Sequence, residues 1–181
     1  TRRVGHAGTL DPMATGVLVL GINKATRLLT WITDHSKRYE ARLRLGVETT
    51  TEDAEGEVTL ARGCTCLDSE EFARTLEHFR GLISQVPSAV SAIKVDGKRA
   101  YARVRAGEEV KLKPRQVQIF LLEVKGEAHP HSVAYDIEGE ERLIPCVDVD
   151  IVVACSAGTY IRALARDIGH ALACGAHLVA L

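Results

Sequence analysis

The sequence is poor in aromatic side chains and has no hydrophobic run long enough to cross a membrane. Phe, Trp and Tyr make up 4% of its 181 residues, so the core must be built mainly from Leu, Val, Ile and Ala. The longest apolar stretch, residues 12–22, is about half of what a bilayer helix needs. No basic and apolar leader precedes it. We therefore expect a soluble, cytoplasmic protein without a membrane partner.

The sequence also lacks the paired cysteines of a disulfide framework or a zinc site. Its five cysteines are Cys64, Cys66, Cys146, Cys155 and Cys174. An odd number, scattered along a chain of this length, is a poor disulfide framework. Cys64 and Cys66 have no second pair at the spacing of zinc ligands, and we interpret His129 and His131 as solvated residues of a polar loop. We predict no metal site.

Composition is otherwise that of a globular protein, with 46% apolar and 26% charged residues, which excludes disordered and collagen-like chains. The net charge of −1 conceals blocks of +5 over residues 1–45, −6 over 46–90, +4 over 91–135 and −4 over 136–181. The two basic blocks could fold into one face that binds phosphate. Surface charges interspersed for solubility are the simpler explanation, so charge permits a nucleic-acid partner without requiring one.

Neither end looks like a natural terminus. The chain starts on a basic run without an initiator Met, and it stops inside the apolar stretch 177–181. An apolar strand with nothing after it leaves side chains and backbone groups without partners. We expect residues 1–181 to be a single domain, truncated at both ends, of a longer protein.

Hydrophobic periodicity predicts an α+β fold, a mainly antiparallel sheet flanked by helices. Residues 37–47 alternate apolar and charged side chains, which is typical of a half-exposed strand. Further strands are expected at 16–21 (buried), 58–61, 115–125, 143–155 and 177–181, with turns at 53–56 and 95–98. Helices are expected at 24–34, from the N-cap Asp68 through Phe72, Leu76, Phe79 and Ile83, at 100–106, and between Gly158 and Gly175. Most connections are too short for parallel crossovers.

Polar residues that this fold does not need lie in three places. His6 and Asp11 lie in a glycine-punctuated loop, Tyr39 lies in the alternating strand, and Arg162 lies in the first turn of the last helix. A cation at that helix position opposes the helix dipole and needs a nearby anion. Each residue also has a plain structural explanation: a turn aspartate with a loop histidine, a core tyrosine, and an exposed charged stripe with Arg166. Spacing alone does not join the three segments.

A resemblance does join them. The segment GHAGTLDPMATGVL, residues 5–18, resembles the signature of TruB-type tRNA pseudouridine synthases. Further blocks follow in the order of that family, namely KRY at 37–39, TEDAEG at 51–56, QVP at 85–87, SAIKVDGKRAY at 91–101, GTYIR at 158–162 and CGAH at 174–177. The resemblance implies a pseudouridine synthase catalytic core that isomerises uridine 55 in the T-loop of tRNA. It also implies a cytoplasmic monomer that uses no cofactor or metal, binds the T-arm of tRNA, and here lacks a C-terminal RNA-binding domain.

The resemblance assigns roles to individual residues. It implies Asp11 as the catalytic carboxylate, Tyr39 stacked on the target base, and Arg162 in an ion pair with Asp11. It also places His6, Tyr160 and Leu181 around the flipped nucleotide, and Asp53 against an extruded neighbouring base. The basic blocks supply candidates for phosphate contacts, namely Lys37, Arg38, Arg42, Lys94, Lys98 and Arg99. Ser88 and Val90 depart from the pattern of the family, which puts the packing of their loop in doubt.

The residues leave two functions open. One is the isomerase, in which Asp11 either attacks C1′ or removes the 2′ proton. The other is a tRNA-binding or tRNA-folding chaperone module, with little or no catalysis in this truncated form.

Overall fold

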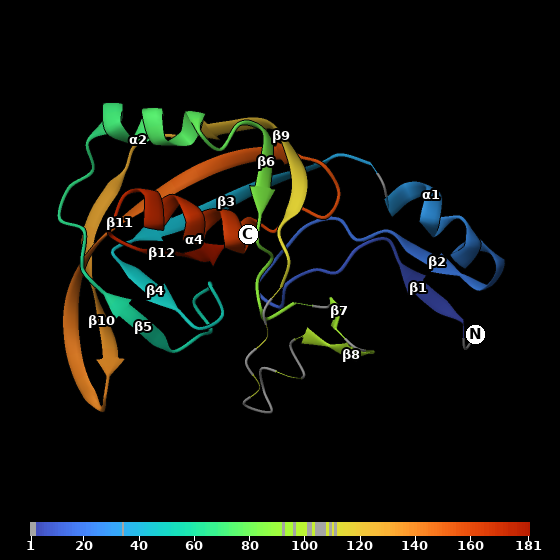
Figure 1. Ribbon diagram of the computed structural model, residues 1–181, viewed down its shortest axis with the longest axis horizontal. Helices are drawn as coiled ribbons and strands as arrows, with labels where there is room; N and C mark the ends of the chain where they lie inside the picture. The colour runs from blue at the N-terminus through green and yellow to red at the C-terminus, as the bar shows by residue number, and fades with distance from the viewer. Residues whose placement is uncertain are drawn as a thin grey trace.

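A six-stranded antiparallel sheet forms the centre of the molecule (Figure 1). The computed structural model describes residues 3–33, 35–91, 93–95, 97–100, 103, 108, 110 and 112–181. Strand order is β12–β3–β11–β9–β6, with β10 paired to the first half of β11. The strands are β3 (Lys37–Leu45), β6 (Gly81–Gln85), β9 (Arg115–Val124), β10 (His129–Ile137), β11 (Glu140–Cys155) and β12 (Ala176–Ala180). The predicted α+β class with a mainly antiparallel sheet is confirmed.

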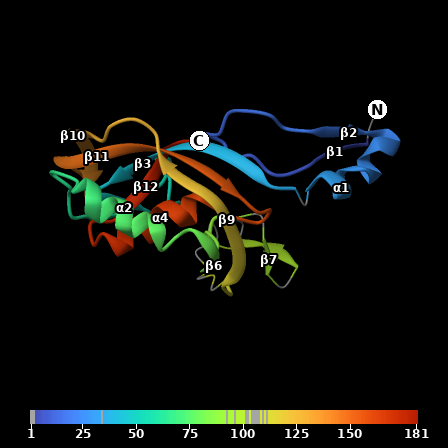
Figure 2. The same cartoon turned by 90° about the horizontal axis from the view of Figure 1, so that it is seen from above.

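The remaining elements are the helices and the shorter strands. They are β1 (Val4–His6), β2 (Leu20–Ile22), the 3-10 helix η1 (Asn23–Arg27), α1 (Leu29–Thr33), β4 (Val47–Thr49), β5 (Val58–Ala61), α2 (Ser69–Glu77), β7 (Lys94–Val95), β8 (Lys98–Arg99) and α4 (Ile161–Ala171). The hairpin β1–β2 and α1 lie to one side of the main sheet (Figure 2). No helix in the described part of the chain has the length and hydropathy needed to cross a bilayer.

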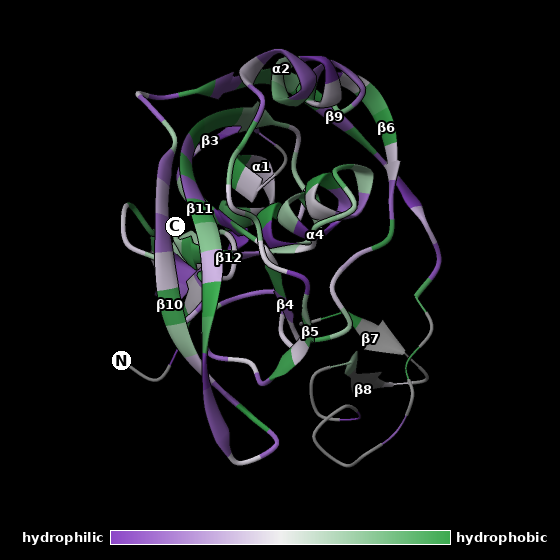
Figure 3. Cartoon of the chain, turned by 90° about the vertical axis from the view of Figure 1, so that its left-hand side faces the viewer, coloured by the Kyte–Doolittle hydropathy of each residue, from purple (hydrophilic) through white to green (hydrophobic). Residues whose placement is uncertain are grey.

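One face of the sheet packs on α2 and α4, and the other is polar. Alternation in β3 buries Ala41, Leu43 and Leu45 against apolar residues of β11 and the two helices. On the opposite face Arg42 and Arg44 each form a bidentate ion pair with the directly opposite residue of β11, Asp150 and Asp148. Bands of hydrophilic and hydrophobic residues alternate along β11 and β10 (Figure 3). This two-sided pattern fixes the register of β3 against β11.

Helix α2 begins where the sequence predicts but ends earlier. Asp68 caps it by accepting a hydrogen bond from the Glu71 backbone N at 2.8 Å, and Phe72 is buried. The helix ends at Glu77, whereas the expected helix ran on to Ile83. Gly81 has a φ of 80°, a left-handed conformation that glycine adopts without strain, and the chain turns there into β6. Ile83 therefore packs on the core from a strand.

Two N-terminal predictions need correction. The segment 16–21 is not a buried strand, because only its end belongs to β2 and Val17 is 91% exposed. The predicted helix 24–34 is divided into η1 and α1, and Leu28 is exposed. Both segments carry apolar residues, yet β2 pairs only with β1, so little of this apolar surface is covered. Leu29 is buried because it packs on the glycines of the β1–β2 hairpin.

The segment of His129 and His131 is a strand, where the sequence predicted a loop. It forms β10, paired with β11, and both histidines are exposed as expected. Pro130 misled the prediction because proline lacks the backbone donor of a central strand, although an edge strand tolerates it. The turn predicted at 95–98 joins β7 and β8. Asp96 and most of the helix expected at 100–106 lie outside the described residues.

Helix α4 approaches β12 so closely that only glycine fits at position 169. A Cβ added there would lie 2.2 Å from the backbone N of Ala176 and 2.5 Å from the carbonyl carbon of Gly175. Because backbone atoms cannot yield as a flexible side chain does, this contact sets the height of α4 over the sheet.

We expect Gly169→Ala to destabilise the protein by about 1–3 kcal/mol through overpacking. Helix propensity alone predicts the opposite, namely that the substitution raises the free energy of unfolding by about 1 kcal/mol. Urea unfolding of the full-length protein measures the difference, with the exposed neighbour His170→Ala as the control. An unchanged or raised urea midpoint for Gly169→Ala would show that the approach of α4 to β12 leaves room for a Cβ at position 169.

Candidate active site

A cavity of about 510 Å³ lies where the β1–β2 loop, the start of β3, the start of α4 and the end of β12 meet. Its lining includes seven of the residues that the sequence singled out: Asp11, Lys37, Arg38, Tyr39, Tyr160, Arg162 and Leu181. The three polar segments that spacing alone did not connect therefore line one site.

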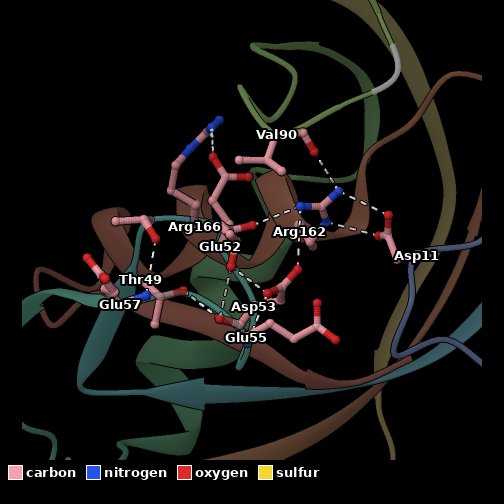
Figure 4. A network of polar contacts seen from close by, with 11 residues as sticks. Asp11, Thr49, Glu52, Asp53, Glu55, Glu57, Val90, Arg162 and Arg166 are labelled. Atoms are coloured by element: carbon pink, nitrogen blue, oxygen red, sulfur yellow. Dashed lines mark hydrogen bonds and ion pairs between the residues drawn. The ribbon is translucent and has the colours of Figure 1, made fainter. Parts of the chain in front are cut away.

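The guanidinium of Arg162 is the central group of this site (Figure 4). Its Nε and Nη2 donate to the two carboxylate oxygens of Asp11 at 2.9 and 3.0 Å, so the ion pair expected between them is present. Nη1 also donates to the Thr51 carbonyl, and Nη2 to the Val90 carbonyl, both at 2.9 Å. A second carboxylate, that of Asp53, lies 3.4 Å from Nη1. One side chain thus joins four segments of the chain.

Burial makes these contacts strong. The Arg162 side chain is 7% exposed and the Asp11 side chain 28%. An arginine in the first turn of a helix faces an unfavourable dipole, which the carboxylates of Asp11 and Asp53 offset. The planar guanidinium presents donors in a fixed fork, so the bidentate pair also orients the Asp11 carboxylate.

Backbone contacts hold the loop that carries Asp11. The Ala14 N donates to the Asp11 carbonyl at 2.9 Å and closes a turn over Pro12. The Thr15 N donates to the Leu181 carbonyl at 2.9 Å, which ties the loop to the chain just after β12. Asp11 is therefore held by its backbone as well as by its ion pair.

Tyr39 lies on the face of β3 that packs toward α4, where it is half-buried and directly opposite Val153 of β11. Burial raises the pKa of its hydroxyl to about 12, and the nearby Cys155 and Asp11 act in the same direction. The ring therefore stays neutral over the whole physiological range. A neutral aromatic ring on the cavity wall is suited to stacking against a planar base.

Other predicted site residues lie differently. His6 is exposed and lies outside the cavity lining, with Nδ1 in contact with the Gly8 carbonyl. Asp53 is 3% exposed, and its carboxylate accepts from the Thr51 hydroxyl and the Glu55 N. It therefore has almost no surface for the extruded base expected against it, and it faces Arg162 instead. Lys94 and Lys98 lie in β7 and β8, and the structure describes only their backbone.

Sequence reasoning missed the role of Gln85. It is 1% exposed, donates to the Tyr160 carbonyl at 3.1 Å and accepts from the Tyr160 N at 2.9 Å. Tyr160 precedes α4 without a side-chain cap of its own, so the amide of Gln85 holds the start of the helix that carries Arg162. The sequence signal for it was its place in the QVP block at 85–87, to which no role was assigned.

No metal-binding arrangement of three or more His, Cys, Asp or Glu side chains occurs within the described ranges. The five cysteines are free thiols.

Solved structures share this fold. The structure titled "Crystal Structure of a Cbf5-Nop10-Gar1 Complex" aligns with a TM-score of 0.64 and 27% identity over 99% of this chain and 39% of that chain. "Structure of H/ACA RNP bound to a substrate RNA containing 2'-deoxyuridine" aligns with a TM-score of 0.59 and 26% identity over 99% and 37% of the two chains. Together with the site, this likeness defines an α+β core of the pseudouridine synthase type.

The chain belongs to the TruB family. Residues 1–161 match the family described as "TruB family pseudouridylate synthase (N terminal domain)", which confirms the resemblance seen in the sequence. All 181 residues align with curated proteins named "tRNA pseudouridine synthase B", at 59% identity in Paenarthrobacter aurescens (strain TC1) and 51% in Cutibacterium acnes (strain DSM 16379 / KPA171202). The chain spans 55% and 57% of the length of these two relatives.

The raised pKa of Tyr39 predicts how stability changes with pH. The phenol of Tyr39 ionises at pH 10.0 in the unfolded chain and at about 12 in the folded protein. The contribution of the neutral ring to folding stability is therefore complete below pH 10 and is lost as the pH rises toward 12. The difference in phenolate absorbance between wild type and Tyr39→Phe should titrate near 12. A difference that titrates near 10 would show that the ring is solvated.

Proposed function

We propose that the protein containing this chain isomerises uridine to pseudouridine at position 55 in the T-loop of tRNA, with Asp11 as the catalytic carboxylate. The observation that carries this proposal is the bidentate pairing of Asp11 with a buried arginine at the wall of the 510 Å³ cavity. The names of the curated relatives support the substrate and the reaction.

The reaction needs a carboxylate at the ribose. The C1′–N1 bond of uridine breaks, the base turns, and a C1′–C5 bond forms, after which C5 loses its proton and N1 gains one. The Asp11 carboxylate either attacks C1′ as a nucleophile or removes the 2′ proton to give a glycal-type intermediate. Arg162 donates to both carboxylate oxygens of Asp11 and so orients the carboxylate for either route.

The cavity supplies the other groups. The target uridine must leave its stack in folded RNA, at a cost of a few kcal/mol. Stacking on the Tyr39 ring offsets about 1–3 kcal/mol of this cost. Tyr160 and Leu181 enclose the base, and Lys37 and Arg38 lie in the cavity lining where they can meet phosphate oxygens.

The remaining parts of the proposal concern the partner. Lys37 and Arg38 at the start of β3, together with Lys94 and Lys98, would follow the T-arm of the tRNA, while His6 lies next to the loop of Asp11. A cytoplasmic monomer fits a substrate that is itself a folded cytoplasmic RNA. We also propose that residues 1–181 form a single catalytic domain of a longer protein, because they span 55% and 57% of the length of two curated relatives.

The first experiment replaces Asp11 by Asn in the full-length protein. We expect the release of tritium from C5-labelled uridine in tRNA to fall by at least about 10³-fold, the scale on which removal of a reacting group acts. The affinity for tRNA should be retained, because the substitution removes one charge and keeps the shape. Wild-type turnover in Asp11→Asn would contradict the assignment.

Asp136→Asn is the matched control. Asp136 is an exposed residue near the end of β10 whose carboxylate accepts from the Gly139 N, and an Asn amide oxygen can accept the same bond. This variant should release tritium at the wild-type rate. If the wild-type protein itself binds tRNA and releases no tritium, the molecule is a binding or chaperone module and not an isomerase.

A further inference from the structure

Helix α4 carries Arg162 and Arg166 one turn apart (Figure 4). Both side chains form hydrogen bonds or ion pairs with the same two loops. The first loop, residues 50–57, joins β4 to β5, and the second, residues 86–91, follows β6. Arg162 reaches Thr51 in the first loop and Val90 in the second. Arg166 reaches Glu52 in the first loop at 2.6 Å and the Val86 carbonyl in the second at 2.9 Å. Each loop is therefore held at two points.

Glu52 has an unusual conformation for a glutamate. Its φ is 62°, in the left-handed region that a residue with a Cβ rarely adopts. Its backbone is fixed there, because its N donates to the Thr49 carbonyl at 3.1 Å and its carbonyl accepts from the Leu178 N at 3.0 Å. Such a conformation is strained and persists only where the surroundings hold it.

The Glu52 side chain is also largely shielded from solvent, at 13% exposure. Burial raises the pKa of its carboxyl, and the Arg166 guanidinium is the main influence in the opposite direction. The second carboxylate oxygen, Oε2, has no hydrogen-bond partner among the described residues. The ion pair with Arg166 is therefore the side-chain contact that holds this carboxylate in place.

The neighbours of Glu52 in the chain are the two groups of this loop that contact Arg162. Thr51 presents its carbonyl to Nη1, and Asp53 presents its carboxylate 3.4 Å away. A shift of Glu52 would move both, and Arg162 would then lose part of what orients it toward Asp11. Neither Glu52 nor Arg166 lines the cavity, so the pair can act on the chemistry only indirectly, and Arg162 is the cavity residue that contacts both of the loops they hold.

We propose that Glu52 and Arg166 are a positioning pair that fixes the 51–53 segment so that Arg162 holds Asp11 in its reactive orientation. This inference rests on the proposed isomerase function. The alternative is that the pair contributes to folding alone, in which case the folded fraction of a variant would react at the wild-type rate.

The test uses the full-length protein and separates tRNA binding from reaction. Arg166→Gln removes the charge, and Glu52→Gly removes the carboxylate at a backbone conformation that glycine accepts without strain. For both variants we expect the single-turnover rate at saturating tRNA to fall by about 10- to 100-fold, the effect of a small misplacement of reacting groups. The Kd for tRNA should change by less than about twofold.

Three further variants sharpen the result. Glu55→Gln removes a carboxylate from the same loop at an exposed position and should leave the rate unchanged. Arg166→Lys keeps the charge beside Glu52 and should recover part of the loss seen with Gln. The double variant Glu52→Gly/Arg166→Gln should lose no more than either single variant, since residues that act as one unit are not additive.

A second readout does not depend on activity. In protein labelled with 15N-arginine, the Arg162 Nε–H signal, identified by its shift in Asp11→Asn, should move or broaden in Arg166→Gln and remain in Glu55→Gln. Wild-type rates in both Arg166→Gln and Glu52→Gly, or an unmoved signal, would overturn the positioning role. If the wild-type protein makes no pseudouridine but the signal responds as expected, the proposed function fails while the positioning pair stands.

Discussion

The arrangement of the site depends on one buried cation with a fixed set of partners. Arg162 bonds the carboxylate of Asp11, which lies 151 residues earlier in the chain, and the carbonyls of Thr51 and Val90. Breaking a buried ion pair by removing one partner costs about 3–5 kcal/mol where the remaining charge is left without compensation, so the charged partners of Arg162 matter most. The loop of Asp11, the 50–57 loop, the 86–91 loop and α4 are therefore held in one arrangement by a single side chain.

The sheet and helix provide the rigid frame that this cation requires. On one face of β3 and β11 the apolar residues pack on α4, and on the other the bidentate pairs of Arg42 and Arg44 hold the strand register. The close contact at Gly169 sets the height of α4, and Gln85 secures its first turn. Arg162 projects from the turn that these contacts fix, so packing far from the cavity determines the geometry within it.

Local patterns predicted the long elements well and the marginal ones poorly. The alternation of β3 and the apolar stripe of α4 were readable because each has a buried face opposite a polar one. The segment 16–21 and the helix at 24–34 were misjudged because an apolar pattern predicts burial only where a second layer covers it. Pro130 argued against a strand, although the register of β10 with β11 accommodates it at the edge of the sheet.

By itself the sequence determined the α+β class, the strand and helix faces of the core, and, through a motif resemblance, the residues that would share a site. Periodicity and capping are local properties, so they are visible in a linear string. Only the tertiary structure decided that Asp53 faces Arg162 and has little surface for a base, that Gln85 caps α4, and that Glu52 and Arg166 pair across 114 residues. Those contacts join segments that are distant in the chain, and their energies depend on burial, which no local pattern specifies.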